Sequence, residues 1–156
     1  MALDDTDLTP SEALRELLDT LVEAFDLDAQ VAIEEADGVL LGTIDGAGAE
    51  ALVGDRGSVL DAIQHLAQRF ALRGGEGLRV RVDIAGFRGK REAELRDQAD
   101  RAAERAIAEG RPVALTPMLA ADRRVVHEHL RDRDDVETHS EGNEPERYLV
   151  ITPLTD

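Results

Sequence analysis

The fold is decided by residues 52–66, which read LVGDRGSVLDAIQHL. Two glycines three positions apart, Gly54 and Gly57, are followed directly by apolar residues at helical spacing. Glycine lets a backbone pass close to a bulky ligand, and the N–H groups that open a helix attract phosphate through unpaired donors and the helix dipole. A Gly-x-x-Gly loop is by itself a turn in most proteins, so its meaning depends on the elements around it.

The sequence predicts further helices and strands on both sides of this loop. Thr9 as N-cap, Pro10 at the first helical position and Glu12 at the third indicate a helix start, and Asp37-Gly38 between two apolar runs indicates a hairpin. In the first half the predicted helices are 10–25, 49–53 and 58–70, the last capped by Ser58, and the predicted strands are 29–33, 39–44 and 78–84. In the second half the predicted helices are 90–109 and 119–131, and the predicted strands are 113–115, 136–138 and 148–152, with a loop through Gly142 and Pro145.

These elements predict an α+β chain with two small domains. The first has the order helix, strand, strand, helix, Gly-x-x-Gly, helix, strand, and the second has the order helix, strand, helix, strand, strand. We place the boundary near Gly86–Gly89. The expected organisation is an acidic tail over residues 1–9, a first domain over 10–87 and a second over 88–154.

The charge of the chain is unevenly distributed. The net charge is −16, but residues 1–50 alone contribute −13, whereas residues 51–91 carry +4 and residues 92–156 carry −7. Of the 18 basic residues only Lys90 is a lysine, and the planar fork of arginine binds two phosphate oxygens at once. The segment that contains the Gly-x-x-Gly loop is therefore locally basic, and we expect residues 1–50 to lie away from any bound anion.

Several classes of site are disfavoured. Cysteine is absent, and no apolar run approaches the roughly 20 residues needed to cross a bilayer. The N-terminus lacks the features of a secretory signal, so a cytoplasmic protein without direct membrane insertion is expected. Residues 46–51 nearly fit a dinucleotide fingerprint, but no βαβ unit surrounds them, which argues against a nucleotide-dependent enzyme. His127 and His129 point to different sides of a helix, so no metal site is expected. No cofactor and no catalytic residue are expected either.

Inside the predicted order of elements, the Gly-x-x-Gly segment resembles that of a type II KH domain, which clamps about four nucleotides at this loop. The resemblance implies that Arg56 contacts backbone phosphate. It also implies that Val53, Leu60 and the strand near Val80–Val82 wall a groove for the bases.

The second half carries two further motifs. Residues 123–127 read RRVVH, and arginine, three residues and histidine is the signature for which the R-three-H domain is named. Residues 138–147 read THSEGNEPER and resemble the stretch T-x-S-E-G-x-E-P-x-R. With the linking segment 82–91, these motifs resemble the bacterial Jag family of RNA-binding proteins, also called KhpB, over residues 12–154. No room is expected for the additional N-terminal domain that many members carry.

The resemblance implies a non-catalytic protein that binds single-stranded RNA, or single-stranded DNA. The residues expected to contact it are Gly54, Asp55, Arg56, Gly57, Arg79 and Arg81 in the first domain and Arg123, Arg124, His127, Ser140, Glu141, Gly142 and Arg147 in the second. It also implies a role in RNA regulation and in cell-envelope or division control, a small KH-domain partner protein, and a link to the membrane-protein insertase.

Two features keep alternatives open. Arg123 and His127 lie one helical turn apart and share a face, so one of them could instead pack against the loop at residues 140–145, where Glu141 and Glu144 could form ion pairs. Asp55 places a carboxylate where relatives usually have a basic residue, which opposes phosphate binding. The alternative function is therefore a protein–protein adaptor of the insertase or envelope machinery with weak affinity for RNA.

Overall fold

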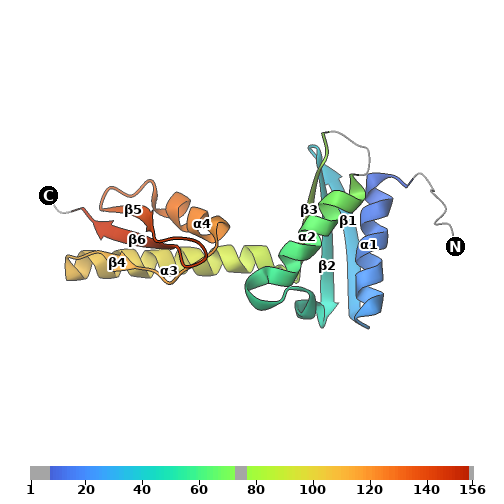
Figure 1. The fold of residues 1–156 in the computed structure, drawn as a ribbon, viewed down its shortest axis with the longest axis horizontal. Helices are drawn as coiled ribbons and strands as arrows, with labels where there is room; N and C mark the ends of the chain where they lie inside the picture. The colour runs from blue at the N-terminus through green and yellow to red at the C-terminus, as the bar shows by residue number, and fades with distance from the viewer. Residues whose placement is uncertain (1–7, 73–76, 155–156) are drawn as a thin grey trace. The chain divides into compact units, whose positions relative to one another are not determined.

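The computed structural model describes residues 8–72 and 77–154, and the chain divides into two compact units, Met1–Arg88 and Gly89–Asp156 (Figure 1). The elements that begin in the first unit are α1 (Pro10–Ala24), β1 (Asp28–Ala36), β2 (Val39–Ala47), the 3-10 helices η1 (Ala49–Leu52) and η2 (Asp55–Gly57), α2 (Ser58–Ala71), β3 (Arg79–Ile84) and α3 (Phe87–Glu109). The elements that follow α3 are β4 (Val113–Ala114), α4 (Ala120–Leu130), β5 (Val136–Glu141) and β6 (Tyr148–Pro153).

Helix α1 begins with the capping box that the sequence predicts. The Glu12 N–H donates to Thr9 Oγ1 at 3.3 Å, and the Thr9 N–H donates back to the Glu12 carboxylate at 2.9 Å. Ala13, Leu14 and Leu18 lie on the buried face of this helix. The prediction succeeds here because four consecutive residues contain the whole interaction.

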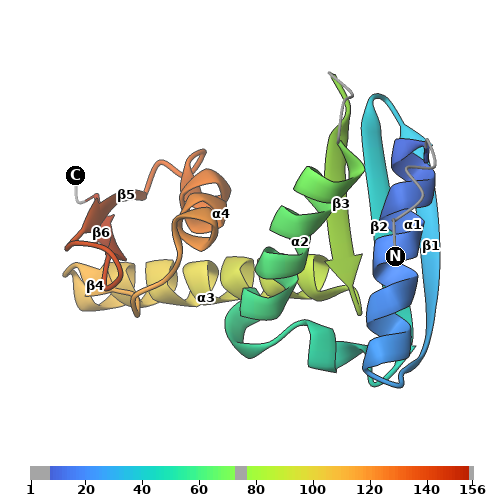
Figure 2. The same ribbon diagram turned by 45° about the vertical axis from the view of Figure 1, so that its right-hand side comes forward.

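The first unit has a three-stranded sheet in the order β1-β2-β3, with β1 antiparallel and β3 parallel to β2. Helices α1 and α2 pack against each other on one face of this sheet (Figures 1 and 2). Strand β1 continues to residue 36 and strand β2 to residue 47, each three residues past the predicted end, because antiparallel pairing keeps these exposed residues in the ladder. The predicted order of elements is confirmed, with η1 in place of the short helix.

The second unit has a three-stranded antiparallel sheet in the order β4-β6-β5. Its core joins an alanine-rich stripe of α3 to Val126 and Leu130 of α4 and to Leu149 and Ile151 of β6. Strand β5 runs to Glu141, three residues past the predicted end, and pairs residue by residue with β6. Residues 139–141 therefore belong to a strand and not to a loop, which fixes the directions of their side chains.

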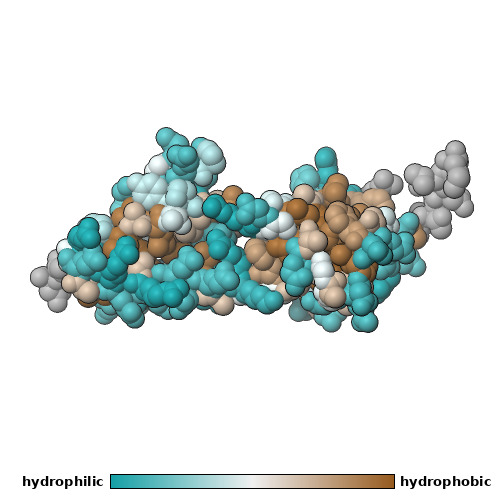
Figure 3. Space-filling view, turned by 90° about the horizontal axis from the view of Figure 1, so that it is seen from below, coloured by the Kyte–Doolittle hydropathy of each residue, from teal (hydrophilic) through white to brown (hydrophobic). Residues whose placement is uncertain are grey.

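The surface of both units is mixed. In the view of Figure 3, hydrophobic residues show near the middle of each unit and hydrophilic residues surround them. Within residues 8–72 and 77–154, no helix combines the length and the apolar character that crossing a membrane requires.

Candidate functional site

The loop between η1 and α2 has an unusual backbone. Gly54, Arg56 and Gly57 all have positive φ, with values of 74°, 52° and 81°. Arginine rarely adopts this conformation, whereas glycine adopts it without a steric cost. The expected cap of α2 is wrong: Gly57 is the N-cap and Ser58 is the first helical residue, without a side-chain capping bond. The side chains of Asp55 and Arg56 are exposed at the tip of the loop.

The hydrogen bonds of the loop leave only part of its backbone free for a ligand. The carbonyl of Val53 accepts from the N–H groups of Val59 and Leu60 at 3.0 and 3.1 Å. In the described part of the chain, the N–H groups of Asp55 and Arg56 have no hydrogen-bond acceptor. The N–H groups left without an acceptor are therefore at the loop tip, whereas those of Val59 and Leu60 in the first turn of α2 are already bonded.

The structure does not bring the other predicted residues of the first unit to this loop. Arg79 and Arg81 alternate with the buried Val80 and Val82. They therefore project from the sheet face that α1 and α2 leave uncovered, whereas the loop leads into α2 on the covered face. Val53 and Leu60, which were expected to wall a base groove, are 7% and 0% exposed and belong to the hydrophobic core, so that expectation is wrong for this conformation.

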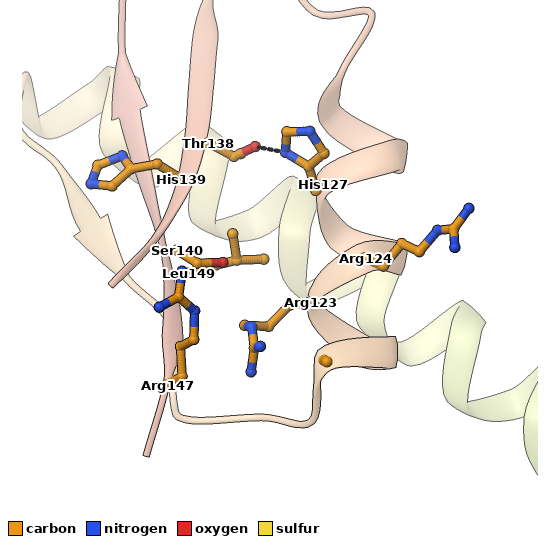
Figure 4. Close-up of a pocket in the computed structure, with 9 residues that line it drawn as sticks. Arg123, Arg124, His127, Thr138, His139, Ser140, Arg147 and Leu149 are labelled. Atoms are coloured by element: carbon orange, nitrogen blue, oxygen red, sulfur yellow. Dashed lines mark hydrogen bonds between the residues drawn. The ribbon is translucent and has the colours of Figure 1, made fainter. Parts of the chain in front are cut away.

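The residues of the R-three-H motif and of the T-x-S-E segment do come together, around an open pocket of about 460 Å³ in the second unit (Figure 4). Three arginines, two histidines and two hydroxyl groups line it, together with two apolar side chains: Arg123, Arg124, Arg147, His127, His139, Thr138, Ser140, Ala120 and Leu149. No carboxylate is among the described residues that line this pocket, although the chain carries a net charge of −16. The pocket is thus a cationic site in an acidic protein.

Arg123 is the most buried of the three arginines, with a side chain 10% exposed. One terminal nitrogen donates to the Met118 carbonyl at 2.6 Å, and the other donates to the Glu144 carboxylate at 2.6 Å. Met118 precedes α4 and Glu144 lies between β5 and β6. Arg123 therefore ties two segments of the pocket wall together while it contributes positive charge to the pocket.

Arg124, next to it, has the opposite environment. Its side chain is 78% exposed and donates from Nε to Glu128, one turn further along α4, at 2.8 Å. This contact lowers the pKa of Glu128 and raises the pKa of Arg124, chiefly through the hydrogen bond between them. The guanidinium is free to rotate toward a ligand, because an exposed helical ion pair is weak.

His127, Thr138 and Arg147 complete the rim of the pocket. His127 Nδ1 and Thr138 Oγ1 lie 2.5 Å apart, in a hydrogen bond whose direction depends on the tautomer. Arg147 donates to the Gly142 carbonyl at 3.0 Å, which orients its guanidinium beside Ser140 and Leu149 (Figure 4). Arginine forks, imidazole and hydroxyl groups in one pocket are the groups that proteins use on phosphate and sugar oxygens.

Glu141 and Gly142 lie beside the pocket and not in its lining. One carboxylate oxygen of Glu141 pairs with His139 Nε2 at 2.7 Å, and the other accepts from the Tyr148 hydroxyl at 3.1 Å. The hydrogen bonds from His139 and then Tyr148 hold the pKa of Glu141 below its ordinary value, and the same carboxylate raises the pKa of Tyr148. Glu141 therefore positions two aromatic side chains at the edge of the pocket.

Replacing this carboxylate should be visible in the titration of Tyr148. In Glu141→Gln the pKa of Tyr148 is expected to fall toward the ordinary tyrosine value, because an uncharged amide no longer disfavours the tyrosinate. The raised pKa means that the interaction stabilises the folded protein below the ordinary tyrosine pKa and is lost as pH rises through the raised value. The chain has one tyrosine and no tryptophan, so tyrosinate absorbance reports this group alone. Identical titration curves for both proteins would contradict the contact.

Four lining residues of the pocket are not predicted from the sequence: the polar Thr138 and His139 and the apolar Ala120 and Leu149. Thr138 and His139 lie in the T-x-S-E segment, but the predicted strand ends at residue 138. The signal that could have found Thr138 is its position two residues before Ser140, because alternate residues of a strand share a face. Arg123 carried a similar signal: it shares the spacing i, i+3, i+7 with Val126 and Leu130, the buried residues of α4.

Comparison with known proteins supports the motifs. The family model of the R-three-H domain matches residues 93–153. The protein named RNA-binding protein KhpB in Lactiplantibacillus plantarum is 35% identical over 101 residues, which cover 64% of this chain and 31% of that protein. The proteins of the same name in Clostridium symbiosum and Bacillus subtilis are each 28% identical, over 88% and 93% of this chain and over 63% and 71% of their own lengths. The chain thus spans about a third of the first of these relatives and somewhat under two thirds of the second. The chain is thus similar to proteins named KhpB, the family that is also called Jag, and residues 93–153 of its second unit match the R-three-H domain.

Proposed function

We propose that this protein binds single-stranded RNA without catalysing a reaction, and that the pocket of the second unit makes the main contact. The observation that carries the proposal is the gathering of three arginines, two histidines and two hydroxyl groups around one open pocket. The relatives that are named RNA-binding proteins support the choice of ligand. Single-stranded DNA offers the same phosphates and is a weaker candidate.

The residues of the pocket have different roles in the proposed binding. Arg124 and Arg147 contact backbone phosphates through their guanidinium forks, and His127 with Thr138 and Ser140 supplies hydrogen bonds to sugar or base. Arg123 acts as a positioning residue, since the Met118 carbonyl and Glu144 already accept two of its hydrogen bonds. Glu141 and Gly142 support this arrangement from beside the pocket.

The Gly54–Gly57 loop makes a second and weaker contact. Its tip offers the N–H groups of Asp55 and Arg56 and the exposed guanidinium of Arg56. The Asp55 carboxylate opposes an approaching phosphate by like-charge repulsion. Arg79 and Arg81, on the uncovered face of the sheet, contribute general positive charge and no contact at the loop.

The wider role that we propose rests on the family resemblance. It is RNA regulation linked to cell-envelope and division control in the cytoplasm, with a small KH-domain protein as a partner and a functional link to the membrane-protein insertase. The rival proposal is a protein–protein adaptor with little affinity for RNA, and its supporting observation is Asp55 at the loop tip.

A matched pair of arginine variants separates these proposals. Arg124→Ala is expected to weaken binding of a labelled single-stranded RNA by about three- to tenfold, since it removes one charge-assisted contact, and to reduce the salt slope of log K by about one. The control is Arg105→Ala, because Arg105 is also exposed and also paired with an acidic residue four positions later, but lies on α3 and does not line the pocket. Fluorescence anisotropy at two salt concentrations measures both effects. Equal affinity in wild type, Arg124→Ala and Arg105→Ala would favour the adaptor.

A further inference from the structure

The sheet of the first unit has one face that α1 and α2 leave uncovered. The two helices pack on the opposite face, against core residues that include Leu40 and Val82 (Figure 2). Since side chains alternate along a strand, the residues between the core positions point to the uncovered face. We call this surface the open face, and it includes Ala32 and Glu34 of β1, Val39 and Leu41 of β2, and Arg79 and Arg81 of β3.

Charge is ordered across the open face. The strand register places Glu34 of β1 opposite Leu41 of β2, and Leu41 opposite Arg81 of β3. One row of the sheet thus reads carboxylate, leucine, guanidinium, with roughly 10 Å between the backbones of β1 and β3. Within residues 8–72 and 77–154, the side chains of Glu34, Arg79 and Arg81 form no hydrogen bond or ion pair. The face therefore carries an acidic side and a basic side that do not neutralise each other.

The middle of the open face is apolar. Val39 and Leu41 are half-buried, yet neither is part of the hydrophobic core of the first unit or packs against it. Ala32 is exposed on the neighbouring strand. An apolar centre inside a charged rim is the arrangement that protein–protein interfaces have.

We propose that two copies of this protein associate through their open faces. A twofold axis that lies between the copies and runs along β2 places Leu41 over Leu41 of the second copy, and it places Glu34 over Arg81 in both directions. Stacked sheets lie about 10 Å apart, a gap that a glutamate and an arginine side chain span together. A twofold axis across the strands would instead place Glu34 over Glu34. The charges therefore select one of the two symmetric arrangements.

The edges of the sheet are poorer places for two copies to meet. The edge of β3 is already covered, because Gln64 of α2 donates to the Val80 carbonyl and accepts from the Val82 N–H, both at 2.7 Å. The edge strand β1 carries exposed carboxylates at Glu34 and Glu35, so a second β1 beside it would bring like charges together. The open face is where acidic and basic groups of two copies can pair.

The contact between the faces is small. Six residues of β3 with their partners in β1 and β2 cover about 14 Å by 20 Å, which is less than the roughly 800 Å² per partner of a standard interface. Two stacked sheets cross at about 30°, so the row of Leu41 matches best. Asp45 lies four residues further along β2, where the crossing moves the two copies apart. The dimer is therefore weak, with a dissociation constant on the order of 0.1–1 mM.

The first test measures self-association of the full chain without RNA. Sedimentation velocity from about 10 µM to 1 mM at about 0.15 M salt should show a weight-average sedimentation coefficient that rises with concentration, since distant charges are screened at this salt. Glu34→Arg should remain monomeric, because it faces Arg81 of the second copy. The control is Glu35→Arg: Glu35 is also exposed, but it pairs with the buried Leu40 and so points to the other side of the sheet. It should associate as the wild type does. A wild type that stays monomeric, or a Glu34→Arg protein that associates equally well, would overturn the proposal.

The second test uses two charge reversals against each other. Arg81→Glu alone should be monomeric for the same reason as Glu34→Arg. In an equimolar mixture of the two variants, each acidic group of one meets a basic group of the other at both positions, so the mixture should associate about as well as the wild type. Matching unfolding midpoints show that both variants are folded. If the mixture stays monomeric, or either variant alone associates, the twofold arrangement is wrong. The proposed function is not affected by either result, because neither experiment contains RNA.

Discussion

Arg123→Ala is expected to destabilise the second unit by about 2–3 kcal/mol, because it removes two hydrogen bonds from a charged and largely buried donor. The Met118 carbonyl and Glu144 would lose a partner at 2.6 Å each, and the segments before α4 and between β5 and β6 would no longer be tied together. The affinity for RNA should fall together with the stability, because Ser140 and Arg147 flank the segment between β5 and β6 that Arg123 would no longer hold. Urea unfolding and hydrogen exchange of the α4 and β5 amides measure the loss.

Arg124→Ala is the matched control for this variant. It removes an adjacent arginine whose side chain is 78% exposed, so its unfolding midpoint should stay close to that of the wild type while its RNA affinity falls. The two variants would then distinguish a residue that positions the wall of the pocket, Arg123, from a residue that contacts RNA, Arg124. An Arg123→Ala protein that is as stable as the wild type would show that the buried contacts of Arg123 do not hold the pocket.

Gly57→Ala is expected to destabilise the first unit by about 2–4 kcal/mol, as the sum of backbone strain and a steric clash. The φ of Gly57 is +81°, and a Cβ there would lie 2.6 Å from a ring carbon of Phe87. Either the loop or the start of α3 would have to move. Thermal unfolding of the variant measures the cost.

The chain contains a matched control for this substitution. Gly89 lies in α3 without a positive φ, and a Cβ there would have no heavy atom within 4 Å. Gly89→Ala is therefore expected to be neutral or to stabilise the protein by up to about 1 kcal/mol through helix propensity. If the two alanine variants unfold at the same temperature, the contact between Gly57 and Phe87 does not constrain the loop.

The sequence predicts most of what is local in this fold. The Thr9–Glu12 capping box is contained in four residues, and the alternation of residues 79–84 correctly separates the buried valines from the exposed arginines. Neither pattern says on which side of the sheet the helices pack. For that reason the sequence groups Arg79 and Arg81 with the loop, although their alternation with the buried valines places them on the other face of the sheet.

The candidate site, too, is only partly predictable from the sequence. The R-three-H and T-x-S-E motifs predict which segments meet, but adjacent Arg123 and Arg124 look alike in sequence, and only the 100° step between helical neighbours turns one inward and the other outward. Gln64 is less predictable still. Its partners Val80 and Val82 lie 16 and 18 residues away, and a polar residue on a helix gives no sign that it covers a strand edge.

Residue-resolved NMR of the full chain with increasing amounts of single-stranded RNA shows whether the RNA binds at the pocket of the second unit. If it does, the largest chemical-shift changes fall on Arg124, His127, Thr138, Ser140 and Arg147, with smaller changes at residues 54–58 and none along the acidic α1 and β1. Shift changes that leave residues 123–147 untouched, or a spectrum that RNA does not change at all, would contradict binding at this pocket.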